Sequence, residues 1–224
     1  MRDLSAFMNT IGYQFKNPAL LEQALTHSSY ANERHTKSNE RLEFLGDSVL
    51  SFIAARYLYK NVDQDEGRLS KYRSAIVCEK ALASYSTELG VGQYLLLGKG
   101  ERKSGGEERT STLEDTFEAL VGAIYLDSGI QAATRFALPF LKKELKNTKQ
   151  HKFKDYKTIL QEIVQQNPGE TLTYVLVNES GPDHDKSFTF EVHLNSNVIG
   201  KGKAKSKKEA EQLAAKEALS LMGY

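Results

Sequence analysis

Cysteine is almost absent from this chain of 224 residues: Cys78 is the only one, so no disulfide can form within the chain. Long apolar runs are also absent, and none approaches the ~20 residues that a membrane-spanning helix needs. The first five residues lack the apolar stretch of a signal peptide. These absences argue against a disulfide scaffold and a membrane protein. They predict a protein of the reducing cytoplasm, with Cys78 as a small core residue.

An excess of charge of one sign is lacking too. The chain holds 30 Lys+Arg and 29 Asp+Glu, a formal net charge of +1. A basic overall balance is the usual sign of a nucleic-acid partner, and this chain does not have it. The positive charge is concentrated locally instead, in a stretch of five lysines: Lys201, Lys203, Lys205, Lys207 and Lys208.

The spacing of the apolar residues changes along the chain and predicts two domains. From about residue 5 to 145 this spacing is mostly helical. After Asp155 a short helical segment is followed by runs in which apolar residues alternate with others, as is typical of strands. We therefore predict an all-α domain over 1–146, a polar linker over 147–154 and a small α+β domain over 155–224. The element order of the second domain is α-β-β-β-α.

The last helix of this second domain is predicted to begin after Ser206. Ser206 followed by Glu209 is the capping-box pattern of a helix start. Lys207 and Lys208 then lie in the first turn, where the helix dipole disfavours cations. Free N–H groups and two ammonium groups would form a site for phosphate there, whereas the alternative is an ordinary solvated lysine run. The predicted buried stripe of the helix is Ala210, Leu213, Ala214 and Leu221.

Residues 40–48, ERLEFLGDS, predict an amphipathic helix with an apolar side and an acidic side. At spacings i, i+3 and i+7, one stripe about 60° wide holds three carboxylates: Glu40, Glu43 and Asp47. Like charges at these spacings destabilise a helix. The stripe therefore makes sense if a cation binds against it.

Residues 113–122 predict a second acidic helix. Asp115 and Glu118 share one face with Gly122, the opposite side is apolar, and Glu114 is expected to lie outside this acidic stripe. If both helices pack on one core, four carboxylates can converge: Glu43, Asp47, Asp115 and Glu118. Oxygen ligands without nearby Cys or His suit Mg²⁺ or Mn²⁺. The alternative is a pair of solvated acidic helix faces.

These segments resemble motifs of the ribonuclease III family. Residues 40–48 match the signature of the family without a substitution, and residues 115–120, DTFEAL, resemble its second acidic motif. Residues 25–30, LTHSSY, and residues 65–67, DEG, match in order and spacing. The resemblance runs from about residue 5 to the C-terminus. Glu114 is a departure, since small residues are more usual there.

The resemblance implies an endoribonuclease that hydrolyses double-stranded RNA with Mg²⁺, or with Mn²⁺ in its place, and without an organic cofactor. The products would have 5′-phosphate and 3′-hydroxyl ends with short 3′ overhangs. Ribosomal RNA precursors and other structured transcripts would be the substrates. By this resemblance Asp47 and Glu118 are the acids most sensitive to change. The metal ligands would be Glu43, Asp47, Asp115 and Glu118, with support from Glu40 and Glu66.

The family also implies a homodimer, because cutting both strands requires two sites related by a two-fold axis. Phe44 and Leu45, beside the acidic stripe, would belong either to the dimer interface or to an intrachain core. Lys99, Arg102 and Lys103 lie in a glycine-rich interval. They would either contact phosphates or form a solvated loop.

The second domain resembles a double-stranded RNA-binding domain, including residues 181–184, GPDH, between its first two strands. The resemblance implies that its first helix reaches ribose 2′-OH groups in one minor groove and that His184 enters the next. Lysines would hold phosphates across the major groove between them. The implied contacts are Thr158, Gln161, Glu162, Gln165, His184, Lys205, Lys207 and Lys208. The other histidines are expected to be structural or exposed.

Two other functions remain possible from the residues. In the first, the protein binds double-stranded RNA without cutting it, which a degenerate acidic set would indicate. In the second, it is a metal-dependent phosphohydrolase of small substrates, for which an RNA-binding domain would be superfluous. All six acids of the family pattern are present, and so is the second domain, so the nuclease is the favoured hypothesis.

Overall fold

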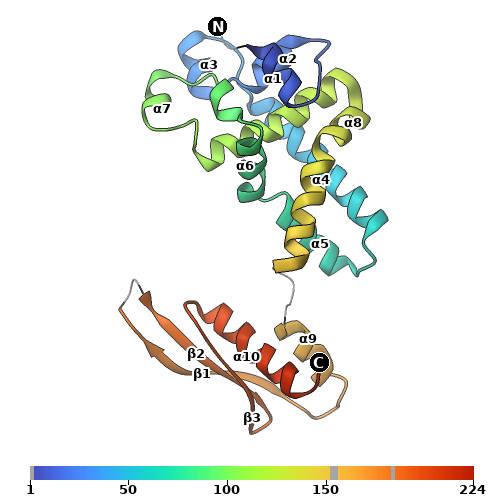
Figure 1. Cartoon of the computed structure of the whole chain (residues 1–224), viewed down its shortest axis with the longest axis vertical. Coiled ribbons are helices and arrows are strands. Elements are labelled where there is room, and N and C mark those ends of the chain that lie inside the picture. Colours follow the sequence, from blue (N-terminus) through green and yellow to red (C-terminus); the bar gives the residue numbers. More distant parts are fainter. Residues whose placement is uncertain (1–2, 152–155, 183–184) are drawn as a thin grey trace. The chain divides into compact units, whose positions relative to one another are not determined.

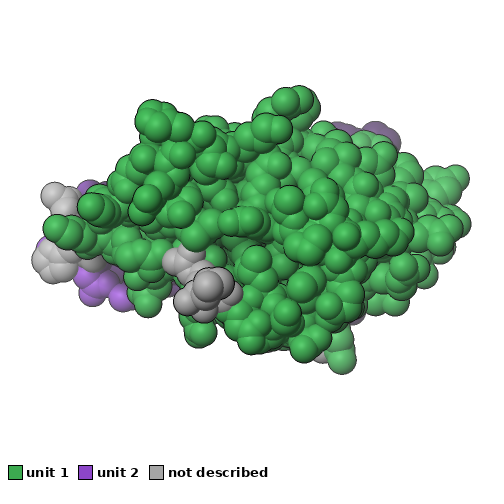
Figure 2. Space-filling view, turned by 90° about the horizontal axis from the view of Figure 1, so that it is seen from above, with its two compact units in different colours: residues 1–150 green, residues 151–224 purple. Residues whose placement is uncertain are grey.

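The computed structural model describes residues 3–151, 156–182 and 185–224, and the chain divides into two compact units, residues 1–150 and 151–224. Figure 2 shows these units in separate colours. The first unit is helical (Figure 1). Its elements are α1 (Leu4–Thr10), α2 (Pro18–Ala24), α3 (Ser28–Arg34), α4 (Glu40–Asn61), α5 (Glu66–Ile76), α6 (Glu79–Glu88), the 3₁₀ helix η1 (Val91–Tyr94), α7 (Lys99–Lys103) and α8 (Thr110–His151).

The apolar side of α8 forms much of the core of the first unit. Phe117 is fully buried, and its ring centroid lies 5.3 Å from that of Tyr85, 5.5 Å from that of Phe136 and 5.6 Å from that of Phe140. The apolar stripe predicted for this helix is confirmed, since all of its members are buried: Leu113, Phe117, Leu120, Val121 and Ile124. With this side packed inward, Asp115 and Glu118 lie on the opposite side.

The long helix α8 is interrupted at Gly129, which has φ 77° and ψ −178°. A positive φ is accessible to glycine at little cost, so the chain can turn here. Just before this break, Asp127 ties the N-terminal segment to α8. One Asp127 carboxylate oxygen accepts hydrogen bonds from the Tyr13 hydroxyl (2.5 Å) and the Lys16 amide (3.0 Å), and the other accepts one from the Asn17 amide (2.9 Å).

The linker prediction needs correction at its start. Residues 147–151 belong to α8, which ends at His151, whereas the sequence predicts linker from residue 147. The buried side of the helix continues past residue 146, because Thr148 is buried like Leu141 and Leu145 before it. Residues 152–154 of the predicted linker lie outside the described residues.

Cys78 is exposed, so its prediction as a core residue is wrong. It occupies the N-cap position of α6, in the connection from α5, and its thiol donates a hydrogen bond to the carbonyl oxygen of Ala75 at 3.3 Å. Among the described residues, no helix is long and apolar enough to cross a membrane.

The second unit is a small α+β domain with the predicted element order. It consists of α9 (Tyr156–Val164), β1 (Leu172–Ser180), β2 (Ser187–Leu194), β3 (Asn197–Ala204) and α10 (Lys207–Leu221). The strands form an antiparallel sheet in the order β1-β2-β3, and both helices lie on the same face of it (Figure 1). The predicted cap of α10 is present, because the Ser206 hydroxyl accepts a hydrogen bond from the Glu209 amide at 3.2 Å.

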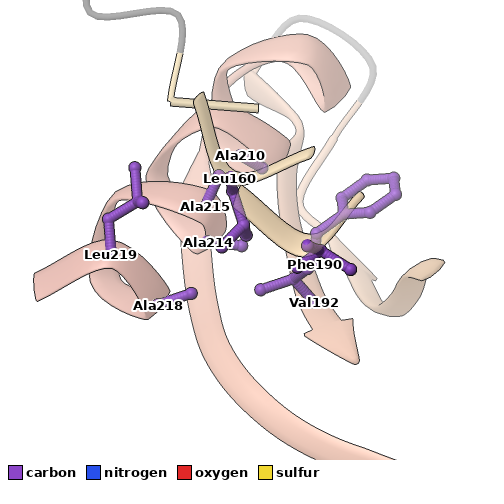
Figure 3. Close-up of a cluster of buried hydrophobic side chains, with 9 residues drawn as sticks. Leu160, Phe190, Val192, Ala210, Ala214, Ala215, Ala218 and Leu219 are labelled. Atoms are coloured by element: carbon purple, nitrogen blue, oxygen red, sulfur yellow. The ribbon is translucent and has the colours of Figure 1, made fainter. Parts of the chain in front are cut away.

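The core of the second unit lies between the sheet and the two helices. Leu160, Phe190 and Val192 meet the inner side of α10 (Figure 3). The predicted stripe of α10 is partly wrong, because Leu213 is 38% exposed and Leu221 is 75% exposed. A Cβ added to Gly200 or Gly202 of β3 would overlap backbone atoms of α10, so the helix approaches this strand closely. Small residues permit that approach, and the buried residues of α10 are Ala210, Ala214, Ala215, Ala218 and Leu219.

Candidate active site and RNA-binding surfaces

Two glycines allow α4 and α8 to cross with their backbones in contact. A Cβ added to Gly46 would overlap the carbonyl group of Glu118, and one added to Gly122 would overlap the carbonyl oxygen of Leu42. Glu118 of α8 therefore lies at the crossing itself, against Gly46, and Asp47 is the next residue of α4. The four acids predicted to converge come from the turns on either side of this contact: Glu43, Asp47, Asp115 and Glu118.

These carboxylates lie close enough to perturb one another. Burial, followed by the charges of Asp47, Glu114, Glu43 and Asp115, raises the pKa of Glu118 to about 8. The pKa of Glu43 is raised for the same reasons, with burial first and then the charges of Asp115, Glu40 and Asp47. Partial burial and neighbouring negative charges both disfavour ionisation of a carboxyl group. The crossing is thus a compact, strongly negative site that favours a proton or a cation.

The two supporting acids differ in their placement. The charge of Glu40 raises the pKa of both Glu43 and Asp115, so Glu40 borders the site, where its carboxylate accepts a hydrogen bond from the Ser38 hydroxyl at 2.6 Å. Glu66 lies exposed in the first turn of α5 and accepts a hydrogen bond from the Ser70 hydroxyl at 2.7 Å. It is not among the charges that shift the pKa of Glu43, Asp115 or Glu118.

Two further acids belong to this site, and the sequence analysis missed both. Burial, and after it the charges of Glu79, Asp115, Glu43 and Asp47, raises the pKa of Glu114 to about 7. Its expected place outside the acidic stripe is therefore wrong, and its i, i+4 spacing to Glu118 was the available signal. Glu79 comes from the first turn of α6, and no local pattern connects that turn with α8.

One histidine also lies near the acids. Burial raises the pKa of Asp115, while a positive charge on His27 would lower it. His27 is the N-cap residue of α3, where its Nδ1 atom accepts a hydrogen bond from the Ser29 amide at 3.2 Å. With Nδ1 used in this way, a neutral imidazole carries its proton on Nε2. His27 therefore lies close enough to Asp115 to act on its charge, and a positive imidazole there would oppose the repulsion among the acids.

The chemistry of the donors fits a hard divalent cation, because all of them are carboxylates. Their raised pKa values express the same preference, since a cation would relieve the repulsion that now favours protonation. The side chains themselves do not form a coordination sphere. In the part of the chain that the structure describes, no three His, Cys, Asp or Glu side chains are grouped as a metal site. The crossing gathers the acids, but their side-chain conformations are not those of a ligand set.

The second unit has its predicted contact residues on two surfaces. On α9, Gln161 and Glu162 are exposed and Thr158 is half-buried, while Gln165 is exposed just beyond the end of the helix. This side of α9 is opposite the buried Leu160. His184 lies outside the described residues. The three predicted lysines are exposed around the start of α10: Lys205, Lys207 and Lys208.

The short helix α7 carries the three cations whose role the sequence left open. Lys99, Arg102 and Lys103 are all exposed. Two bonds hold the start of this helix against α3: the Gly98 amide donates to the Ser29 hydroxyl at 3.0 Å, and the Lys99 amide donates to the Glu33 carboxylate at 2.8 Å. The cations are thus presented by an anchored helix.

Comparison with known proteins agrees with both units. The family described as Ribonuclease-III-like matches residues 17–145, and the double-stranded RNA binding motif matches residues 156–222. Ribonuclease 3 of Caldanaerobacter subterraneus subsp. tengcongensis is 51% identical over 217 residues, which cover 95% of each chain. The chain belongs to the ribonuclease III family. Ribonuclease 3 of Borreliella burgdorferi is 48% identical over 223 residues, covering 98% of this chain and 91% of that one.

Solved structures support the same assignment for the first unit. The nuclease domain of ribonuclease III from Campylobacter jejuni is 39% identical and superposes with a TM-score of 0.60, covering 63% of this chain and 98% of that one. As a member of the ribonuclease III family, the protein is an endoribonuclease that acts on double-stranded RNA. This conclusion excludes an RNA-binding protein without nuclease activity and a phosphohydrolase of small substrates.

Proposed function

We propose that this member of the ribonuclease III family hydrolyses phosphodiester bonds of duplex RNA at the crossing of α4 and α8, with Mg²⁺ as its cofactor and Mn²⁺ able to substitute. Each product end would carry a 5′-phosphate or a 3′-hydroxyl, with short 3′ overhangs. One observation carries the proposal: Gly46 and Gly122 bring acids of two helices into one site whose charges repel. The proposed metal ligands are Glu43, Asp47, Asp115 and Glu118.

When bound, a divalent cation lowers the pKa of a water molecule and neutralises charge on the phosphate. The carboxylates of Glu43, Asp47, Asp115 and Glu118 would hold that cation at the crossing. Glu118, with its pKa raised to about 8, would exchange a proton for the cation near neutral pH. Glu40, in the first turn of α4, would support the metal ligands. Glu66, in the first turn of α5, would act on the metal through water rather than directly.

The second unit is proposed to bind the duplex by its shape. Residues on α9 would contact 2′-OH groups in a minor groove, and the lysines around the start of α10 would contact phosphates across the adjacent major groove. A unit of this kind covers about 16 bp. Because shape rather than sequence is read, precursors of ribosomal RNA and other structured transcripts are suitable substrates. The proposed contacts are Thr158, Gln161, Glu162, Gln165, His184, Lys205, Lys207 and Lys208.

We also propose that the protein is a homodimer through the exposed side of α4. Phe44 is 79% exposed and Phe52 is 55% exposed, although both are large apolar side chains on the same helix. Their i, i+8 spacing puts them on one side of it. The structure of the Campylobacter jejuni domain is described as flexible in a region involved in dimer formation of that protein. Sedimentation of the protein and of Phe44→Asp tests this, and a variant that remains dimeric would contradict it.

The proposed division of labour assigns cleavage to the first unit, residues 1–150, and RNA affinity to the second unit, residues 151–224. α7 would add contacts to phosphates through Lys99, Arg102 and Lys103, since these exposed cations belong to the catalytic unit.

The decisive experiment replaces Glu118 with Gln, which keeps the size of the side chain but removes its charge. Cleavage of a perfect RNA duplex in Mg²⁺ should fall by about a hundredfold or more, whereas duplex binding in EDTA should be retained. The matched control is Glu88→Gln, because Glu88 is an exposed acid of the same unit that pairs with Lys143 at 2.8 Å. Near wild-type cleavage by Glu118→Gln would refute the proposed site.

A further inference from the structure

The lysines around the start of α10 have acidic partners within their own unit. The Lys205 Nζ atom lies 2.7 Å from the Oδ1 atom of Asp185, and the Lys207 Nζ atom lies 3.9 Å from the Oε2 atom of Glu179. Glu179 is near the end of β1, and Asp185 precedes β2. Both acids therefore come from the β1–β2 end of the sheet, and both partners are lysines for which we propose phosphate contacts.

Glu179 is well placed to hold a lysine. It is the cross-strand partner of Phe188 in the register of β1 and β2. The Lys207 ammonium lies 5.4 Å from the centroid of the Phe188 ring, so it rests between an aromatic face and a carboxylate. The other oxygen of the same carboxylate, Oε1, lies 3.1 Å from the Nζ atom of Lys186. The Glu179 carboxylate thus partly neutralises two lysines at the surface.

These pairs are exposed and therefore weak. The side chains of Lys205 and Asp185 are 82% and 57% exposed, and those of Lys207 and Glu179 are 58% and 37% exposed. Water and salt screen such pairs, so an incoming phosphate can displace either carboxylate. An ammonium group has three N–H donors, and those directed at the carboxylate are unavailable to RNA while the pair persists. The free energy of RNA binding is therefore reduced by the cost of breaking these ion pairs.

We propose that Glu179 and Asp185 are internal competitors of the RNA phosphates for Lys207 and Lys205, and that they limit the affinity of the protein for duplex RNA. The inference rests on the proposed phosphate contacts of these two lysines. Its consequence is faster dissociation of RNA, including the cleaved product, because each carboxylate recaptures its lysine as the phosphate leaves. If the acids instead orient the lysines for RNA, their removal should weaken duplex binding rather than strengthen it.

The test compares the full-length protein with Glu179→Gln, Asp185→Asn and the double variant. Binding of a perfect RNA duplex is titrated in EDTA at several salt concentrations, so that no cleavage occurs. Each single variant should bind about 1.5- to 5-fold more tightly at low salt. The gain should shrink as salt rises, because the pair that has been removed is already screened. Dissociation of the duplex should slow by a similar factor.

The matched control is Glu191→Gln. Glu191 pairs with Lys201 at 3.2 Å in the same sheet, so its replacement changes the net charge equally without releasing Lys205 or Lys207. An equal gain in this control would show a general charge effect and would overturn the inference. Unchanged or weaker binding by Glu179→Gln and Asp185→Asn would also overturn it.

A second pair of variants separates this inference from the proposed RNA contacts. Lys205→Ala and Lys207→Ala should each weaken duplex binding. If they do and the acid variants bind as the wild type does, the lysines contact RNA and only the competition is refuted. If the lysine variants bind as tightly as the wild type, the proposed contacts fail and the inference fails with them.

Discussion

Gly46 of α4 lies against the main-chain carbonyl of Glu118 of α8, so closely that a single added Cβ would overlap it. The residue that follows Gly46 is Asp47, and Glu118 provides another acid of the candidate site. The absence of a side chain at position 46 therefore determines how far apart the two acidic helices stand. A glycine with no chemistry of its own is as important to this site as the carboxylates are.

The first prediction concerns this contact. Gly46→Ala should force the helices apart and destabilise the protein by about 1–3 kcal/mol, as overpacking of a tight contact does. Cleavage should be lost even in molecules that remain folded, because the acids of α4 and α8 no longer meet. Denaturant unfolding and duplex cleavage measure the two effects. Gly100→Ala is the control, since a Cβ at Gly100 meets no atom within 4 Å; equal behaviour of the two variants would contradict the prediction.

The second prediction concerns pH in the absence of metal. The pKa of Glu118 is about 8 in the folded protein against an ordinary value of 4.5. Below pH 4.5 this carboxyl is protonated in both the folded and unfolded states, and it causes no penalty. As pH rises from about 4.5 to about 8, only the unfolded state ionises readily, so the free energy of unfolding falls. The loss should be on the order of 1–3 kcal/mol, after allowance for solvent screening.

Thermal unfolding in EDTA across that pH range measures this effect. Glu118→Gln does not titrate at this position, so its curve should be flatter than that of the wild type. Parallel curves for the two proteins would rule out the raised pKa. Addition of Mg²⁺ should restore stability chiefly at the upper end of the range, where the acids are ionised and bind a cation best.

The third prediction concerns Glu114, the departure from the family pattern. Its charge helps to raise the pKa of Glu118. Cleavage is expected to rise with pH as Glu118 loses its proton and can bind the cation. Glu114→Gln should lower the pKa of Glu118, so this rise should shift toward lower pH. Glu79→Gln is the control, because Glu79 perturbs Glu114 and Asp115 but is not among the charges acting on Glu118. Complete loss of cleavage by Glu114→Gln at every pH would mean that Glu114 is itself essential.

The fourth prediction concerns the lysines in the first turn of α10. Changing Lys207 and Lys208 to Ala should weaken binding of unrelated duplex sequences alike. It should also flatten the plot of log affinity against log salt by about one unit per lost phosphate contact. Helix stability should hold or rise slightly, because two cations leave the positive end of the dipole. Lys216→Ala, further along the same helix, is the control; an unchanged slope in the double variant would remove these lysines from the RNA-binding surface.

Several features of this protein follow from local sequence alone. The acidic stripe of residues 40–48 and the apolar side of residues 113–124 are periodic patterns, and periodicity is a property of a helix by itself. The cap at Ser206 and the order α-β-β-β-α along the second domain also depend on residues that are close in the sequence. These predictions succeeded because the residues that determine them lie within a few turns or one hairpin of each other.

The errors concern what surrounds a residue in space rather than which local element it belongs to. Leu213 and Leu221 have the hydrophobicity of core residues, yet α10 packs on Gly200 and Gly202 through alanines instead. Cys78 lies exposed in the connection from α5 to α6, and its residue type alone did not reveal that position.

The sequence by itself determined the two kinds of domain, the helices that carry the acids, and the family to which the chain belongs. Only the tertiary structure decided which charges meet: Glu79 and Glu114 join the acidic site, and Glu179 and Asp185 reach the lysines that precede and open α10. The periodic patterns of helices and strands are set by residues that are close in the sequence. Charge interactions depend on distance in space, and packing of small residues at crossings sets that distance.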